Sequence, residues 1–230
     1  LGLQGVCFGH VVTAVSPKAG PYNWGQILWH ELAHVFHLQL SKHRVPRWFT
    51  EGLAEHEAER APHGFVRALD HEVFAMLASG RIPSFENFDA LFFEARSMEE
   101  LVVAYAVSAE AATFLSERFG PGALRAFLVG FGEGAEFAEL VPRVLRVTVA
   151  ALDEAFREHL RAKLARFEGQ FVYAPWSLPP ADEAAKVAAA SPGDASLAGR
   201  HAASLLAEGK QGEARRVAER AIALDAHEPY

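Results

Sequence analysis

The sequence predicts a mainly α-helical fold (α+β), in which a small antiparallel sheet edge precedes the helices and a helical tail follows them. Apolar residues recur at helical spacing over most of the chain, whereas a valine-rich stretch near the start is typical of a strand. Near residue 169 the composition changes, and an alanine-rich stretch follows a segment of prolines and aromatic residues. Because 230 residues suffice for one full domain and a small appendage, we expect a first domain over residues 1–168, a linker over 169–180 and a helical segment over 181–230.

The elements expected in the first domain begin with a strand over residues 6–15, bounded by Gly5 and Ser16. Asn23 is a suitable N-cap for a helix over residues 24–40. Pro46 opens a second helix over about residues 47–59. Glycines and prolines punctuate the rest of the domain, which predicts further helices at about 64–79, 98–119, 121–130 and 148–167.

The overall composition excludes several classes of protein. The 22 basic and 29 acidic residues give a net charge of −7, which argues against nucleic acid or an anionic membrane surface as the main partner. Cys7 is the only cysteine, so neither an intrachain disulfide nor a thiolate zinc finger can form. No run approaches the roughly 20 apolar residues of a membrane helix, so we expect no membrane span. Because the sequence starts at Leu1 rather than methionine, a removed leader or an upstream domain stays open, and the compartment is left unassigned.

The helix over residues 24–40 carries a metal-binding pattern. His30 and His34 lie four residues apart, which on a helix leaves them about 40° apart around the axis and one turn apart along it. Both imidazoles can then face one ion. Glu31 falls on the flank of the pair, where it reaches a water molecule at the ion without binding the metal. The pattern predicts a zinc site; chance is the alternative, because the chain holds 11 histidines.

A third ligand is expected from the second helix. Zinc sites of the gluzincin type take a glutamate from such a helix, and Glu51 follows His34 after sixteen intervening residues. That gap lets the first helix end, a loop turn and an antiparallel helix return. Gly52 and Ala54 indicate that this helix approaches a neighbour closely. Glu55, one turn after Glu51, is interpreted as the carboxylate that accepts the free N–H of a ligand histidine, most simply His30, with a solvated surface acid as the alternative.

The rival zinc pattern of the metzincins is excluded by two residues. That pattern requires a glycine and a third histidine downstream of the first two, and here His37 and Leu40 occupy those positions. His37 shares the helical stripe of His30 and His34. We assign it a structural or rim role and keep substrate contact or accidental ligation as the alternative.

The segment from Val6 to about Leu164 resembles the peptidase MA-like gluzincins, bacterial relatives of thermolysin and of the large zinc aminopeptidases. The matching stretches are HELAH, PRWFTEGLAEH and AYAVSAEAATFLSERFGPGALRAFL. The resemblance implies Zn2+ held by His30, His34 and Glu51, with Glu31 as catalytic base and Tyr105 as the residue that steadies the oxyanion. It also implies that the strand over residues 6–15 pairs with an extended substrate. Without it, Tyr105 would pass for an ordinary helix-face aromatic.

One departure from the family is the short N-terminal part. Only 29 residues precede His30, whereas members of the family usually have more sheet and a helix there, so this part is expected to be shortened or truncated.

The function expected from these residues is hydrolysis of a peptide or protein substrate by a zinc metallopeptidase. Three protein ligands leave a fourth zinc position open, as in catalytic sites. Endopeptidase action is favoured over exopeptidase action, because no acidic residue precedes Glu31 that could anchor a free amine. The alternatives are a catalytically degenerate zinc-binding scaffold and a different hydrolase on the same site, such as an epoxide-opening enzyme.

The tail over residues 197–226 resembles a tetratricopeptide unit. Gly209 stands at the turn, and Ala214 and Ala221 take the small-residue positions of the second helix. His201 and Ala226 depart from the pattern, and a generic alanine-rich helical hairpin is the alternative. One and a half repeats cannot bury a solenoid face alone. Further repeats after residue 230 or docking on the first domain are therefore expected, with a protein partner at this tail.

Overall fold

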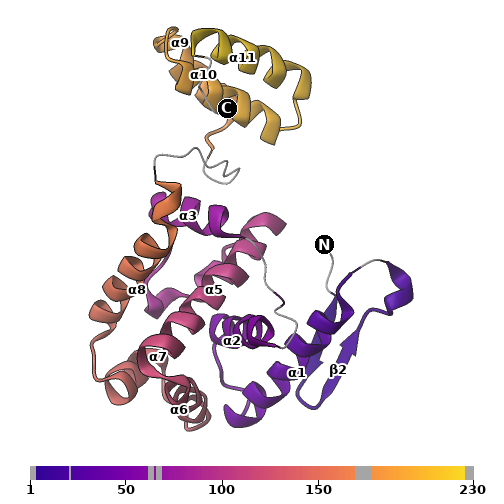
Figure 1. Cartoon of the computed structure of the whole chain (residues 1–230), viewed down its shortest axis with the longest axis vertical. Helices are drawn as coiled ribbons and strands as arrows, with labels where there is room; N and C mark the ends of the chain where they lie inside the picture. The colour runs from indigo at the N-terminus through magenta and orange to yellow at the C-terminus, as the bar shows by residue number, and fades with distance from the viewer. Residues whose placement is uncertain (1–3, 21, 62–64, 66–68, 169–177, 226–230) are drawn as a thin grey trace. The chain divides into compact units, whose positions relative to one another are not determined.

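The protein is mainly helical and carries one small antiparallel sheet in the part described, as predicted (Figure 1). The structure, a computed structural model, describes residues 4–20, 22–61, 65, 69–168 and 178–225. The chain divides into two compact units, Leu1–Leu164 and Ala165–Tyr230. Each unit is described separately below.

The N-terminal segment is a β-hairpin, and the prediction of one strand over residues 6–15 was wrong. Strands β1 (Gly5–Phe8) and β2 (Val11–Ala14) pair antiparallel, with Gly5 opposite Ala14 and Phe8 opposite Val11. The two-residue turn between them starts at Gly9, whose φ of 75° suits the first position of a type II′ turn. The valine-rich composition on both sides of Gly9 concealed this break.

Two antiparallel helices follow the hairpin and agree closely with the prediction. Helix α1 spans Trp24–Leu40, and the Asn23 side chain caps it by accepting a hydrogen bond from the backbone N–H of Gln26. Helix α2 spans Arg47–Arg60 after Pro46. The connecting loop turns through Lys42 and His43, both of which have positive φ.

Six further helices complete the first unit as far as the structure describes it. They are α3 (Asp70–Ala78), α4 (Ala90–Phe93), α5 (Met98–Phe119), α6 (Pro121–Gly132), α7 (Phe137–Leu140) and α8 (Val149–Leu164). Short segments of tighter or wider helix lie at Pro17–Ala19, Phe85–Asn87 and Val141–Leu145. The helix predicted over 64–79 begins only at Asp70, where acidic residues in the first turn favour a helix start; residues 62–64 and 66–68 lie outside the described part.

An aromatic core surrounds the start of α2 and fixes its position. Trp48 and Phe49 are almost fully buried, and their rings contact those of Phe85, Phe88, Phe127, Phe131 and Phe137. On the next turn, a Cβ added to Gly52 would lie 2.3 Å from the carbonyl oxygen of Ser108 in α5. Only glycine permits this approach, so the expected close packing of the second helix is confirmed, with α5 as its neighbour.

The second unit contains three α-helices in its described residues, α9 (Ala181–Ala190), α10 (Ala195–Ala207) and α11 (Gln211–Leu224), and a short 3-10 helix at Ala165–Phe167. Ala181, Leu205 and Ala214 form a small buried cluster against which Val217 packs. Gly209, between α10 and α11, has a φ of 77°. The predicted linker falls largely on residues 169–177, outside the described part, as does Ala226.

Across both units, the described helices include none with the length and apolar character required to cross a bilayer.

Candidate metal centre

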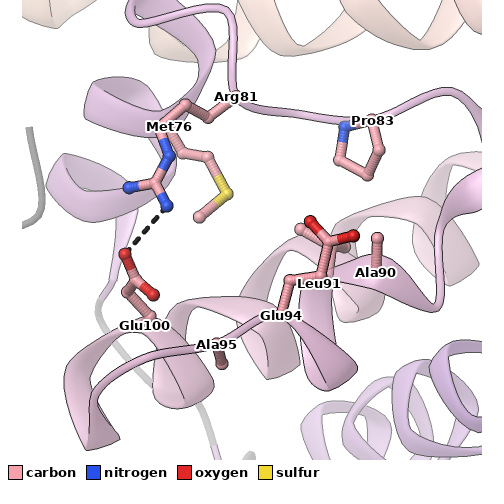
Figure 2. A pocket seen from close by; sticks show the side chains of 8 residues that line it. All are labelled: Met76, Arg81, Pro83, Ala90, Leu91, Glu94, Ala95 and Glu100. Carbon is pink, nitrogen blue, oxygen red and sulfur yellow. Dashed lines mark hydrogen bonds and ion pairs between the residues drawn. The ribbon is translucent and has the colours of Figure 1, made fainter.

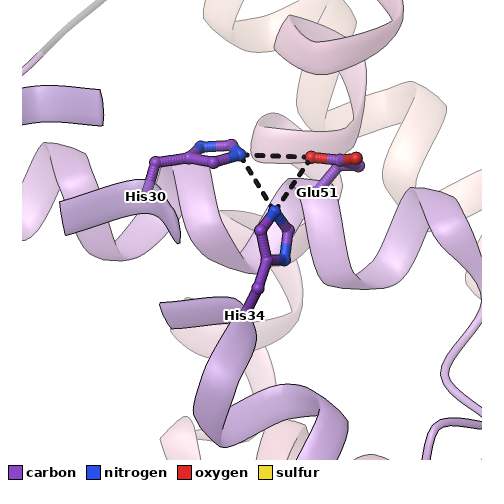
Figure 3. A group of neighbouring side chains, drawn as sticks. All are labelled: His30, His34 and Glu51. Atoms are coloured by element: carbon purple, nitrogen blue, oxygen red, sulfur yellow. Dashed lines mark hydrogen bonds and ion pairs between the residues drawn. The ribbon is translucent and has the colours of Figure 1, made fainter. Parts of the chain in front are cut away.

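His30, His34 and Glu51 converge at one point between α1 and α2 (Figure 3). The His30 Nε2 atom lies 3.1 Å from His34 Nε2 and 3.2 Å from Glu51 Oε2, and His34 Nε2 lies 3.3 Å from the same oxygen. The antiparallel course of the two helices produces this meeting, because a helix turn on α1 faces the first turns of α2. Among the described residues, this is the group of three side chains with metal-ligand spacing.

The donor set fits zinc. Bonds of about 2.0–2.1 Å at tetrahedral angles place neighbouring donors roughly 3.3–3.4 Å apart, and the three measured separations run from 3.1 to 3.3 Å. Two imidazoles and one carboxylate are also the ligand types of catalytic zinc sites, which keep a position open. These residues could therefore hold the ion with little movement.

The pKa values of the cluster indicate that a metal ion would replace a proton shared by the donors. Burial acts to lower the pKa of His30, but hydrogen bonds with Glu51 and Glu55 outweigh it and raise that pKa to about 9. Burial acts to raise the pKa of Glu51, yet His30 and His34 bring it down to about 2. At neutral pH a proton thus bridges these donors, and a divalent cation would compete with it.

Glu55 contacts the ring nitrogen of His30 that faces away from the cluster. Its Oε1 atom lies 3.1 Å from His30 Nδ1, and the residue is only 3% exposed. A solvated surface acid is thereby excluded. Because Nδ1 is engaged with a carboxylate, a neutral His30 would direct its Nε2 lone pair at the cluster, as a metal ligand requires.

Glu31 lies beside the cluster, against the hairpin. It is 8% exposed, and a Cβ added to Gly5 of β1 would lie 2.7 Å from both its Cγ and Oε1 atoms. Burial raises the pKa of Glu31, against the opposing influence of His30 and His34. A carboxylate with a raised pKa accepts and returns protons closer to neutral pH.

Tyr105 of α5 borders the cluster from a third helix. Its ring centroid lies 6.2 Å from that of His30 and 5.2 Å from that of Phe92. Burial raises the pKa of Tyr105, followed by the charge of Glu51, while a hydrogen bond with Arg47 acts to lower it. Arg47 also stacks 5.0 Å above the Phe92 ring and approaches Glu51 Oε1 at 3.8 Å. Because arginine only donates, Tyr105 accepts this bond.

His37 lies one turn beyond His34 and is not part of the ligand group. Its ring centroid is 5.9 Å from that of His34, and its Nδ1 atom lies 3.2 Å from Thr50 Oγ1. Burial, then the charges of His34 and His30, lower the pKa of His37 to about 3. The ring is therefore neutral at physiological pH.

A hollow lies apart from the cluster, between α3, α4 and the start of α5 (Figure 2). Its volume is about 170 Å³. The charge of Arg81 there is engaged at 2.8 Å with Glu100, whose carboxylate also accepts the backbone N–H of Arg96. This pair ties the start of α5 to the preceding loop, so we locate the candidate chemistry at the metal cluster instead.

Three residues near the cluster were missed by sequence reasoning: Gly5, Arg47 and Thr50. Arg47 stands one helical turn before Glu51, and this spacing could have indicated it. Thr50 is adjacent to Glu51, but its contacts depend on how α1 and α2 are rotated. Gly5 gave no usable signal, because its contact with Glu31 requires the hairpin to be known.

Comparisons of this chain with protein-family models, with curated proteins and with solved structures found no match.

Proposed function

We propose that this protein is a zinc-dependent peptidase of the gluzincin type, acting as an endopeptidase rather than an exopeptidase. The observation that carries the proposal is the convergence of His30, His34 and Glu51 from two antiparallel helices at zinc spacing. The resemblance of the surrounding segments to the peptidase MA-like gluzincins adds to it. Neither element alone is specific, but a chance motif would not bring a third ligand to the same point.

Glu31 has the environment of a catalytic base. When bound, zinc supplies Lewis-acid chemistry, polarising the scissile carbonyl and lowering the pKa of water. Glu31 is buried at the edge of the cluster with a raised pKa. It takes a proton from the attacking water and delivers it to the leaving amine.

Tyr105 is proposed as the donor to the oxyanion that forms on the substrate carbonyl. The bond that Tyr105 accepts from Arg47 draws electron density from the hydroxyl oxygen, which makes this hydroxyl a stronger donor. Arg47 itself is 42% exposed along its side chain, so it adds a positive charge at the mouth of the site.

Endopeptidase action is supported by the composition of residues 1–30 and by the hairpin. Aminopeptidases hold the substrate's free amine with acidic residues upstream of the motif, and residues 1–30 contain no Asp or Glu. The hairpin beside α1 offers an extended backbone for pairing with a substrate peptide. Such pairing can engage an internal segment of the peptide, so a free terminus is not required.

The alternative is a zinc-binding scaffold that acts through its tetratricopeptide-like tail. It is favoured by the exposed apolar side chains of the second unit, such as Ile222 and Leu206, each 50% exposed. The two readings differ in whether bound zinc supports hydrolysis.

The test is metal analysis of the purified protein, followed by digestion of a peptide library with and without a chelator. We expect zinc at one equivalent and cleavage that the chelator abolishes. Glu31→Gln should retain zinc and lose cleavage. Tyr105→Phe should retain measurable cleavage activity, about 10²–10³-fold below that of the wild type. Glu154→Gln, which removes an exposed carboxylate on α8, is the control. Bound zinc without chelator-sensitive cleavage would favour the scaffold, and full activity in Glu31→Gln would refute the mechanism.

A further inference from the structure

The hydroxyl group of Thr50 lies between two buried histidines. Its Oγ1 atom is 2.8 Å from His34 Nδ1 and 3.2 Å from His37 Nδ1. Both residues are under 10% exposed, at 8% for His34 and 6% for His37. Water therefore does not readily substitute for either contact, and the hydroxyl serves both nitrogens, while His37 also hydrogen-bonds to the Thr50 backbone.

The proton on His34 Nδ1 determines the direction of both hydrogen bonds. His34 directs Nε2 at His30 and Glu51, so a neutral His34 that offers its lone pair there carries its proton on Nδ1. That N–H donates to Thr50 Oγ1. A hydroxyl has a single proton of its own, which is then free for the Nδ1 atom of His37.

We propose that Thr50 and His37 are positioning residues of the metal centre, joined to His34 in a chain of hydrogen bonds that runs from His34 through Thr50 to His37. The chain fixes the ring orientation and the proton position of His34. It rests on the proposed zinc site and extends it to a residue that is not a ligand. His37 acts only through Thr50: its Nδ1 atom accepts the hydroxyl proton and so keeps that proton directed away from His34.

The two ligand histidines are thus held in different ways. The Nδ1 atom of His30 lies 3.1 Å from the carboxylate of Glu55, whereas in the proposed chain His34 donates to a neutral hydroxyl. A hydroxyl can rotate and could also donate toward His34, which would favour the wrong proton position. A second acceptor removes that freedom, and His37 is placed to provide it. Thr50 also precedes Glu51 directly, so one turn of α2 holds both a ligand and the partner of another ligand.

Zinc affinity measured by competition with a chelator tests the chain. Thr50→Val keeps the shape but removes the hydroxyl, and we expect affinity to fall about 10–100-fold, as for other groups that orient a metal ligand. Thr50→Ser should recover most of the loss, and His37→Phe should give an intermediate loss.

The control is Thr113→Val, because Thr113 Oγ1 contacts the buried His56 Nδ1 at 2.9 Å in the same unit, away from the cluster. It should leave zinc affinity unchanged. Thr50→Val with wild-type affinity, or Thr113→Val with an equal loss, would overturn the proposal.

The proton positions can be read in the wild-type protein by nitrogen NMR of the histidine rings, which does not depend on any variant folding. We expect the zinc-loaded protein to carry the His34 proton on Nδ1 and the His37 proton on Nε2. A His37 proton on Nδ1 would reverse the chain and refute it. Failure of the wild type to bind zinc would remove the metal centre itself, whereas zinc binding that is indifferent to Thr50 would overturn this inference alone.

Discussion

Helices α1 and α2 both supply ligands to the candidate metal centre, yet they are held in the fold very differently. Helix α2 lies in the aromatic core, and Trp48, Phe49 and Ala54 are at most 2% exposed. Helix α1 lies at the edge of the first unit. Trp29, Leu32 and Phe36 on its outer face are 42%, 51% and 61% exposed.

Because α2 is buried and α1 is exposed, substitutions on the two helices should affect stability and chemistry to different degrees. The core fixes α2, so Thr50, Glu51 and Glu55 form a rigid half of the site. The other half, His30, Glu31 and His34, is held mainly by contact with α2 and the hairpin. Substitutions of the core residues of α2 should therefore destabilise the unit, whereas many on α1 should leave folding intact and alter function.

The largest expected effect contrasts one phenylalanine on each helix. Phe49→Ala removes a ring that packs against Phe127 and Phe131, and should lower the free energy of unfolding by about 3–5 kcal/mol. Phe36→Ala removes an exposed ring and should change it by no more than about 0.5 kcal/mol. Urea unfolding of both variants measures the contrast. Equal losses would contradict the distinction between the two helices.

A second contrast uses one glycine on each helix. Gly52→Ala places a Cβ against the Ser108 carbonyl and should destabilise the protein by about 1–3 kcal/mol or more. A Cβ at Gly25 of α1 meets its nearest atoms at 3.5 Å or beyond. Gly25→Ala should thus stabilise by up to about 1 kcal/mol through helix propensity. Melting temperatures of the two variants measure the contrast. A melting temperature of Gly52→Ala at or above that of the wild type would show that α2 tolerates more displacement than its contacts suggest.

The same two helices show what could be predicted from the sequence. Their limits depend on local signals, an Asn23 cap and Pro46, and the structure agrees with the prediction within one or two residues. The meeting of His30, His34 and Glu51 also follows from helical spacing, once an antiparallel return is assumed. These features need no knowledge of distant contacts.

What could not be predicted depends on how elements pack. The hairpin was read as one strand, because a glycine in a valine-rich run does not reveal a turn without its partner strand. The role of Thr50 between His34 and His37 requires the rotation of α2 about its own axis. Trp48 packs against the rings of Phe85, Phe88 and Phe137. These residues lie in or next to short elements whose sequences show no clear periodicity.

The hairpin side of α1 gives a smaller expected effect that concerns chemistry alone. Gly5→Ala should push the side chains of Glu31 and Ile27 aside, since side chains yield more easily than backbone. A displacement of part of an ångström should lower kcat about tenfold, less than the 10²-fold that a full ångström can cost. Zinc affinity should stay unchanged. Gly20→Ala, whose added Cβ meets nothing within 4 Å, is the matched control, and an equal loss in both would rule out a contact with Glu31 as the cause.

The smallest expected effect is the pH dependence conferred by His56, which shows how tightly α2 is packed away from the metal cluster. Burial lowers the pKa of His56, despite the opposing charge of Glu57. The unfolded chain therefore takes up a proton that the folded protein resists, so the stability from this residue is present above pH 6.5 and is lost as the pH falls below it. His56→Gln can still hydrogen-bond to Thr113 but does not titrate. Between pH 6.5 and 5, urea unfolding should show wild type losing stability faster than the variant, and parallel curves would mean that His56 is solvated enough to charge in the folded state.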